Sequence, residues 1–320
     1  MHTPEEILLC RSDAIANPTN TIPWSAYAAR RAISFLSTPI IPKKILDSSA
    51  DGLSRAKELA LEGYGNVFLA SHPGQGEIPR LLTLFAEDPI LGRKELGIPE
   101  SVEHIKGWHS NKLTRITVFP IPTEASVEYF ATKPPLGTDK KELAAYEKML
   151  RKKAAYEQML REAALEYTTK HPEKPRKDIK RAGQVVLLEN CLDGETELLR
   201  RNGMVLIFLQ GSRYPYLETI TNAVSMLVNR TNRAGFDKYT LTAIGVGIQD
   251  KQGKDLTDYT DAAVAGYNIR RRYTFNVGRT FTCLEYQQEA QKSGLTLDEL
   301  ALKQLGLVVP AGYRAPRKTP

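Results

Sequence analysis

The fold is decided by the stretch "YGNVFLASHPGQGEIPRLLTLFAEDP", residues 64–89, which predicts a turn, a strand, a glycine-rich loop and a helix in succession. Gly65 ends the preceding helix, and the run Asn66–Ala70 predicts a buried strand. Pro79 is expected to begin the next helix, where its missing N–H costs no hydrogen bond. A strand followed closely by a helix is the repeating unit of α/β folds.

The same alternation recurs along the chain. We expect helices at 54–62, 139–170, 184–201, 217–233 and 297–305, and strands at 115–121, 204–209, 239–249 and 272–278. Thr296 and Glu299 form the pattern of a capping box at the start of the last helix. The pattern predicts an α/β fold with a mixed, largely parallel central sheet flanked by helices.

Three regions are expected from these elements. Residues 1–55 form a small N-terminal helical region, and residues 56–138 together with 182–320 form the α/β domain. Residues 139–181 form a basic helical insertion, an arm between core elements that ends where Pro172 and Pro175 break the helix. The echo of "AAYEKML" by "AAYEQML" ten residues later places the two copies on different helix faces, which indicates a local duplication in a surface helix.

A helix is also expected near the N-terminus, from residue 24 to about residue 36. Trp24, Ala28, Ala32, and Phe35 with Leu36 would lie on one side of it, with Arg30 and Arg31 elsewhere. Such a stripe packs on the protein's own core, the interpretation we favour, or lies in a membrane interface.

Composition limits the class of protein. The chain has 320 residues, 44 Lys+Arg and 37 Asp+Glu, a net charge of +7. Residues 139–181 carry 13 basic and 8 acidic residues, and residues 270–320 carry 9 and 4. Such regions suit a phosphate-bearing ligand, an acidic carrier protein, an anionic membrane surface or nucleic acid, and a solvated basic face without a partner is equally compatible.

The cysteines and the apolar runs bear on location. The three cysteines lack a CxxC pair, so we expect neither a disulfide framework nor a metal site, and a cytoplasmic location. The longest clean apolar run, 204–209, is too short to span a membrane, and the acidic N-terminus predicts no secretion signal. Contact with a membrane would therefore be peripheral.

His72 and Glu77 are the candidate catalytic pair. His72 directly follows the strand 66–70, a common position for catalytic groups in α/β proteins. A histidine that acts as a base needs a carboxylate to orient it, and Glu77 could reach back across Gly74 and Gly76. The alternative is that Glu77 only favours the helix N-terminus electrostatically and His72 is an ordinary loop residue.

Arg213 is the second candidate. It lies just beyond the strand 204–209 in "FLQGSR", beside backbone N–H groups freed by Gly211, where a guanidinium could hold a phosphate. A surface salt bridge is the alternative role for this side chain.

Taken together, these motifs resemble those of the glycerolipid acyltransferases, which include glycerol-3-phosphate and lysophosphatidic acid acyltransferases. "ASHPGQGEIP" is similar to the family's first motif, with Ser71 for Asn and Glu77 for Asp, and "FLQGSR" to its third, with Gln210 for Glu. "LTAIGVGIQ" and the tail "VPAGYRAP" follow in the family's order, and the resemblance spans about residues 60–316. The soluble plastid-type glycerol-3-phosphate acyltransferases are closest in style.

The resemblance implies an acyltransferase-like fold and acyl transfer from acyl-CoA or an acyl-carrier protein to glycerol-3-phosphate or lysophosphatidic acid, in phospholipid biosynthesis. His72 would be the base and Glu77 its partner, while Gly74, Gly76 and Gly211 would form the loops around the oxyanion. Arg213, with Lys112 and Arg115 of "NKLTRITVFPI", would hold the acceptor's phosphate. It implies no metal or cofactor.

Three other functions are alternatives to acyl transfer. A catalytically impaired relative could bind lipids or a membrane surface without using His72. An α/β-hydrolase is disfavoured because the chain has no Gly-x-Ser-x-Gly elbow. A nucleic-acid-binding protein is not expected, because the chain has no helix-turn-helix signal, zinc-finger spacing or aromatic platform motif.

Overall fold

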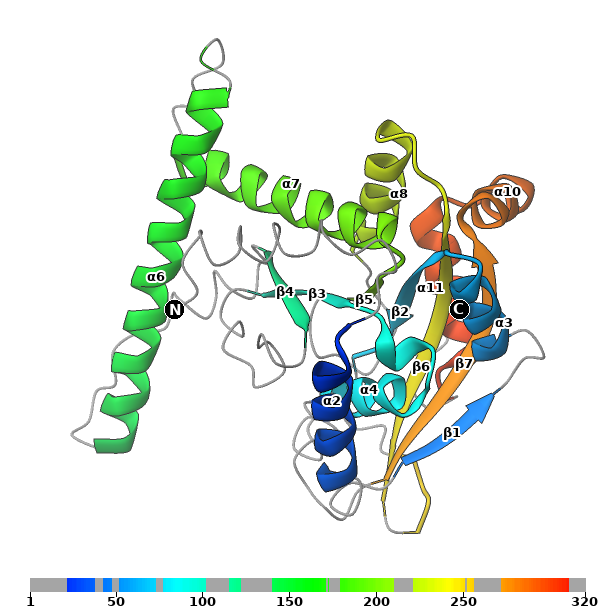
Figure 1. Ribbon diagram of the computed structural model, residues 1–320. Coiled ribbons are helices and arrows are strands. Elements are labelled where there is room, and N and C mark those ends of the chain that lie inside the picture. The colour runs from blue at the N-terminus through cyan, green and yellow to red at the C-terminus, as the bar shows by residue number, and fades with distance from the viewer. Residues whose placement is uncertain are drawn as a thin grey trace, which may run out of the picture. The chain divides into compact units, whose positions relative to one another are not determined.

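The computed structural model describes residues 22–37, 43–47, 52–72, 77–101, 115–121, 140–170, 172, 179–209, 221–250, 252–255 and 272–310 (Figure 1). The strands are β1 (Lys43–Asp47), β2 (Gly65–Ala70), β3 (Leu96–Ser101), β4 (Ile116–Ile121), β5 (Met204–Phe208), β6 (Tyr239–Gln249) and β7 (Arg272–Thr282). The helices are α2 (Trp24–Ser37), α3 (Gly52–Leu61), α4 (Glu77–Glu87), the 3₁₀ turn η1 (Leu91–Arg93), α6 (Lys140–Lys170), α7 (Ile179–Arg200), α8 (Ala223–Arg233), α10 (Cys283–Ser293) and α11 (Leu297–Val308).

The strands of the described residues form one sheet in the order β1-β7-β6-β2-β5-β3-β4. The pairs β1–β7, β6–β2, β2–β5 and β5–β3 are parallel, whereas β6 and β7 are antiparallel. The prediction of an α/β fold with a mixed, mostly parallel sheet is therefore confirmed. The central strand β2 is buried along its whole length, as expected for a strand covered on both faces.

Helices cover both faces of the central strands (Figure 1). On one face, Asn66 of β2 donates a hydrogen bond to the carbonyl of Ala56 in α3, and Phe68 contacts Phe85 of α4. On the other face, the Tyr239 hydroxyl of β6 lies 2.9 Å from Thr231 of α8.

The end of α11 also packs on this second face. A Cβ at Gly245 of β6 would lie 2.2 Å from the Val308 carbonyl oxygen at the end of α11. Only glycine at position 245 allows this close approach of helix and strand. The sheet is therefore sandwiched between α3 with α4 and α8 with α11.

The chain divides into two compact units. One comprises residues 1–97, 111–117 and 195–320, and the other comprises residues 98–110 and 118–194. The second unit contains the whole of the predicted arm, residues 139–181, and extends beyond it on both sides. The domain boundaries drawn from the sequence remain predictions.

Within the second unit, α6 and the first half of α7 share a hydrophobic cluster of Met149, Tyr156, Leu160, Ala163, Ala164, Tyr167, Ala182, Val186 and Leu187. A Cβ at Gly183 would lie 2.3 Å from the Leu160 carbonyl oxygen, so the two helices approach closely there. Both copies of the sequence echo contact this cluster, since Met149 and Tyr156 are buried in it and Tyr146 and Met159 pack against it. The expected separation of the two copies onto different helix faces is therefore not what the structure has.

The helix α2 forms as predicted, but the face that we expected it to bury is wrong. Trp24 is 69% exposed, and Ala28 and Ala32 are exposed as well. Among the described side chains, the buried side consists of Ala26, Tyr27 and Arg30. Arg31, which we expected to lie away from Trp24, is exposed on the same side, and the side chains of Phe35 and Leu36 lie outside the described residues. The favoured interpretation, in which the Trp24 stripe packs on the core, is therefore contradicted.

Arg30 is buried because its guanidinium satisfies backbone carbonyls. It donates to the carbonyl oxygens of Gly92 at 3.1 Å, Lys94 at 2.6 Å and Arg115 at 2.8 Å. Burial lowers the pKa of Arg30 to about 10, an effect that Glu95 partly opposes, so the group stays charged at neutral pH. An arginine can therefore be buried on a helix face that a hydropathy pattern predicts to be exposed, because its guanidinium forms hydrogen bonds there.

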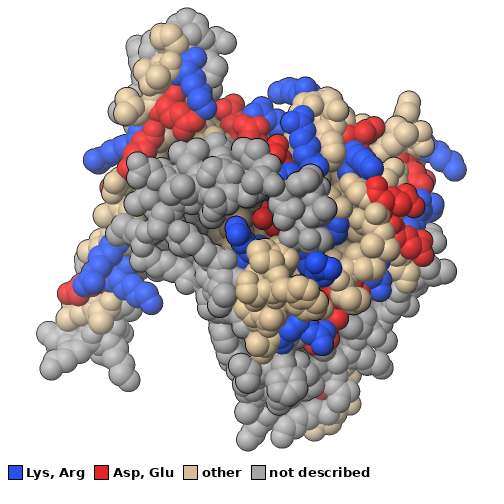
Figure 2. Space-filling view, in the orientation of Figure 1, with Lys and Arg blue, Asp and Glu red and all other residues tan. Residues whose placement is uncertain are grey.

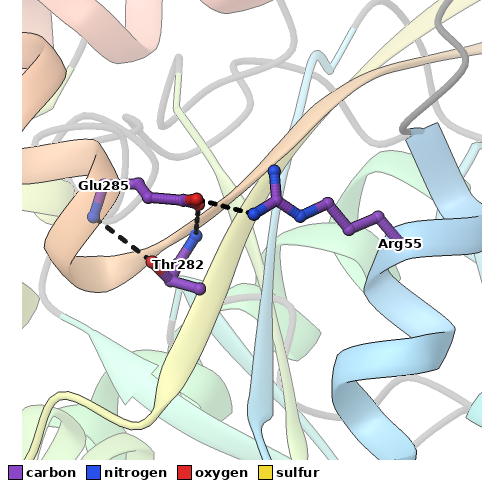
Figure 3. Close-up of polar contacts among 3 residues, drawn as sticks. All are labelled: Arg55, Thr282 and Glu285. Atoms are coloured by element: carbon purple, nitrogen blue, oxygen red, sulfur yellow. Dashed lines mark hydrogen bonds and ion pairs between the residues drawn. The ribbon is translucent and has the colours of Figure 1, made fainter.

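The helix α10 was not predicted, although its sequence contains the signal. Thr282 accepts a hydrogen bond from the Glu285 N–H at 3.2 Å, and the Glu285 carboxylate accepts from the Thr282 N–H at 2.8 Å. This capping box has the Thr-x-x-Glu spacing that predicted α11. Glu285 also pairs with Arg55 of α3 at 2.6 Å (Figure 3).

We expect Glu285→Gln to lower stability in a pH-dependent way. Burial raises the pKa of Glu285, but the hydrogen bonds from Thr282 and the Arg55 guanidinium outweigh it and hold the pKa below its ordinary value. The stabilisation is therefore present above the carboxyl's unfolded pKa and is lost as pH falls through the lower folded pKa. It should amount to roughly 0.5–1 kcal/mol, because the pair is partly solvated.

Urea unfolding at pH 7 and at pH 3.5 measures this effect. The difference between wild type and Glu285→Gln should shrink at the lower pH. Glu289→Gln on the same helix is the matched control and should follow the wild type at both pH values. A Glu285→Gln difference that is the same at both pH values would contradict the assignment.

Candidate functional site

The candidate site lies at the carboxyl ends of the parallel strands β6, β2 and β5. Ala70, the last residue of β2, is in register with Phe208 of β5 and Ile244 of β6. The chain after β2 continues into α4 on one face of the sheet, and the chain after β5 continues into α8 on the other. Ligands of α/β proteins commonly bind where adjacent strands send their connections to opposite faces.

His72 projects from this edge of the sheet. It is half-buried, and its imidazole ring lies 4.6 Å from the Phe208 ring, with the two planes tilted by 33°. A contact of this kind restricts the orientation of the imidazole while leaving part of it accessible. His72 therefore lies at the end of a strand, as predicted.

Ser71 anchors the backbone on which His72 is carried. Its N–H donates to the Ile244 carbonyl at 3.2 Å, and its hydroxyl accepts from the Val246 N–H at 2.8 Å. Ser71 thus extends the pairing of β2 with β6 by one residue. This gives a structural reason for serine at the position where the family motif has Asn.

The end of β5 is secured in a similar way. The Leu209 N–H donates to the Ala70 carbonyl at 3.3 Å, and the Thr221 N–H returns to the Leu209 carbonyl at 2.8 Å. Leu209 is therefore held next to β2, and Thr221, which leads into α8, is held to Leu209. Phe208 and Ser71 were not predicted as site residues, although each lies at a strand end next to a motif.

Most other predicted site residues lie outside the described residues. These are Gly74, Gly76, Lys112, Gly211 and Arg213. Glu77 is the first residue of α4, two residues earlier than the predicted helix start, and its side chain is also outside the described part. The pairing of His72 with Glu77 remains a prediction.

Arg115, in contrast, lies within the described residues, and its backbone is not next to His72. Its carbonyl accepts from the Leu96 N–H at 3.5 Å, and Leu96 is in register with Met204, which pairs with Asn66 at the start of β2. At about 3.3 Å per residue, His72 lies roughly 20 Å farther along the strand direction. The backbone carbonyl of Arg115 instead accepts a hydrogen bond from the buried guanidinium of Arg30. The backbone of Arg115 therefore lies toward the opposite end of these strands from His72, and the expected phosphate contact of its side chain remains a prediction.

The surface of the arm is also less uniformly basic than the composition of residues 139–181 indicates. Along the described part of α6, Glu147 pairs with Arg151 at 3.7 Å and Glu166 with Lys170 at 2.5 Å. Both acidic and basic side chains are visible over the described part of this helix (Figure 2). These pairs make the described part of α6 a solvated, mixed-charge surface.

No family model and no curated protein matches the chain. The resemblance to glycerolipid acyltransferases therefore rests on the four ordered motifs. Within the described ranges, no group of three or more His, Cys, Asp or Glu side chains gathers closely enough to hold a metal ion. In the same part of the chain, no helix combines the length and apolar character needed to cross a bilayer.

Proposed function

We propose that this protein transfers an acyl group from a thioester, acyl-CoA or an acyl-carrier protein, to a hydroxyl of glycerol-3-phosphate or lysophosphatidic acid. The observation that carries the proposal is His72, half-exposed at the carboxyl end of β2 with its ring against Phe208. A partly accessible imidazole on a rigid strand end suits a general base for a bound hydroxyl.

The proposed reaction transfers the acyl group straight to the acceptor by addition to the thioester carbonyl and elimination of the thiolate, without a covalent acyl-enzyme. His72 takes the acceptor's hydroxyl proton as the oxygen attacks the thioester carbonyl carbon. The new C–O bond forms, the C–S bond breaks, and the thiolate leaves with the proton returned from the imidazolium. Glu77 would orient the imidazole, and backbone N–H groups of the loop holding Gly74 and Gly76 would stabilise the oxyanion. Arg213 would hold the phosphate and so position the hydroxyl.

An assay of the purified full chain tests this proposal. Acyl-CoA and acyl-carrier protein are each offered with glycerol-3-phosphate, with lysophosphatidic acid and without acceptor, and acylated product is measured by mass spectrometry. We expect product that requires both donor and acceptor. Thioester hydrolysis that is indifferent to the acceptor, or no product from folded protein, would overturn acyl transfer; the latter would favour the non-catalytic lipid-binding alternative.

A further inference from the structure

The outward side of α2 carries a large aromatic residue that the fold does not use for its core. Trp24 is 69% exposed, and its ring meets the Tyr27 ring edge to face at 5.3 Å. The Arg93 guanidinium lies 5.8 Å from the centre of the Trp24 ring, within the range of a cation–π contact. The indole is therefore held in place at the surface.

The helix that presents Trp24 is firmly attached. Arg30 donates to three backbone carbonyls, the Ile22 N–H donates to the Arg93 carbonyl at 2.7 Å, and Arg31 donates to the Glu87 carbonyl at 3.0 Å. Rotating α2 to bury Trp24 would break these contacts. The stripe of Trp24, Ala28 and Ala32 is thus a stable feature of the surface.

The charge around this stripe is basic. The sequence of α2 contains Arg30 and Arg31 but no Asp or Glu, and Arg31 is exposed. Arg93 adds a further cation beside the indole. In Figure 2 the uncharged surface over α2 is bordered by blue basic side chains, with smaller areas of red acidic side chains beside them. An anionic surface would complement this arrangement.

The size of the stripe favours a membrane over a second protein as its binding partner. A stable protein interface buries about 800 Å² on each partner, far more than one indole and two alanine methyl groups provide. Shallow insertion at a lipid headgroup layer requires much less, and tryptophan flanked by arginine is the residue combination enriched there.

We propose that the outward side of α2, formed by Trp24, Ala28, Arg31 and Ala32, docks on an anionic lipid bilayer with the Trp24 indole inserted at headgroup depth. This surface does not depend on acyl-transfer chemistry, so its test and that of the proposed function can fail separately.

Binding of the full chain to vesicles tests the proposal. The chain has two tryptophans, so Trp108→Phe leaves Trp24 as the single fluorophore. With phosphatidylglycerol-containing vesicles at low salt, we expect a blue shift of Trp24 emission and quenching by lipids brominated near the headgroup. Phosphatidylcholine vesicles should produce little change, and added salt should weaken the binding.

Co-sedimentation of variants with the same vesicles identifies the contact. Trp24→Ala should weaken binding about tenfold and Trp24→Phe about twofold, because less apolar area is inserted. Arg31→Gln should weaken it about fivefold, as expected for one basic residue near an anionic surface. Leu307→Ala is the matched control, since Leu307 is 64% exposed on α11 away from this stripe; its binding should equal the wild type.

Four results would overturn the proposal. Wild-type protein that does not bind anionic vesicles at low salt would exclude the bilayer. Equal binding by Trp24→Ala, or equal binding to phosphatidylcholine, would exclude the assigned contact. A dimer that dissociates in Trp24→Ala, seen by sedimentation velocity without vesicle binding, would assign the stripe to a second copy of the chain.

Discussion

His72→Ala is expected to lower kcat for acyl transfer by about 10²–10⁴-fold, the usual contribution of a positioned general base. The protein should remain folded, because His72 is half-exposed at a strand end and lies outside the buried core of β2. His72→Gln should lose as much activity, since an amide can donate a hydrogen bond but cannot take the hydroxyl proton.

Two variants make this prediction specific. Phe208→Leu keeps an apolar side chain but removes the ring that lies 4.6 Å from His72, so we expect a loss of several-fold in kcat. His171→Ala replaces a histidine of the helical arm and should have no effect. Circular dichroism confirms that each variant is folded, and kcat and KM are measured with the best substrate pair. Full activity in folded His72→Ala would remove His72 from the mechanism.

Asp298→Ala should be among the most destabilising single changes in the larger unit. Asp298 lies in the first turn of α11 and is only 7% exposed. Its carboxylate accepts from the N–H groups of Val224 at 3.1 Å and Ser225 at 3.3 Å, and from the Ser225 hydroxyl. Because Asn222, the N-cap of α8, makes no side-chain cap bond, Asp298 performs that role from another helix.

Removing this carboxylate leaves donors of the first turn of α8 without a partner in a buried place. We expect a loss of about 3 kcal/mol, from the cap, the unsatisfied groups and the lost charge at the helix N-terminus. The melting temperature should fall by roughly 5–10 °C for a chain of this size.

The controls separate capping from a general effect of substitution. Asp298→Asn keeps one acceptor oxygen and should lose about 1 kcal/mol. Asn222→Ala should stay within about 0.5 kcal/mol of wild type, because its side chain makes no cap bond. The assignment would be wrong if Asp298→Ala melted at the wild-type temperature, or if Asn222→Ala were the more destabilising change.

The local elements of the sheet could be predicted well from the sequence. The buried run at β2, the strand at β5 and the capping box of α11 formed at or within a residue or two of the expected positions. These are cases in which hydrophobic pattern and cap chemistry act over a few neighbouring residues. The same reasoning applied to Thr282 and Glu285 would have found α10.

Only the part of the candidate site that depends on the end of a single strand could be predicted from the sequence. His72 follows β2 directly, so its place at the carboxyl edge follows from the strand itself. Arg115 precedes a strand, and its distance from His72 depends on how β4, β3, β5 and β2 are aligned. Residues far apart in sequence meet according to strand order and register, which local patterns do not specify.

By itself, the sequence of this protein determined the alternation of strands and helices, the parallel α/β class and the position of His72, because each depends on short-range periodicity or on a strand end. Only the tertiary structure decided which side of α2 is buried and that Asp298 caps a helix by accepting from Val224, 74 residues away in the chain. Arg30 is buried because three backbone carbonyls from distant segments surround its guanidinium, and such a socket exists only after the chain has folded.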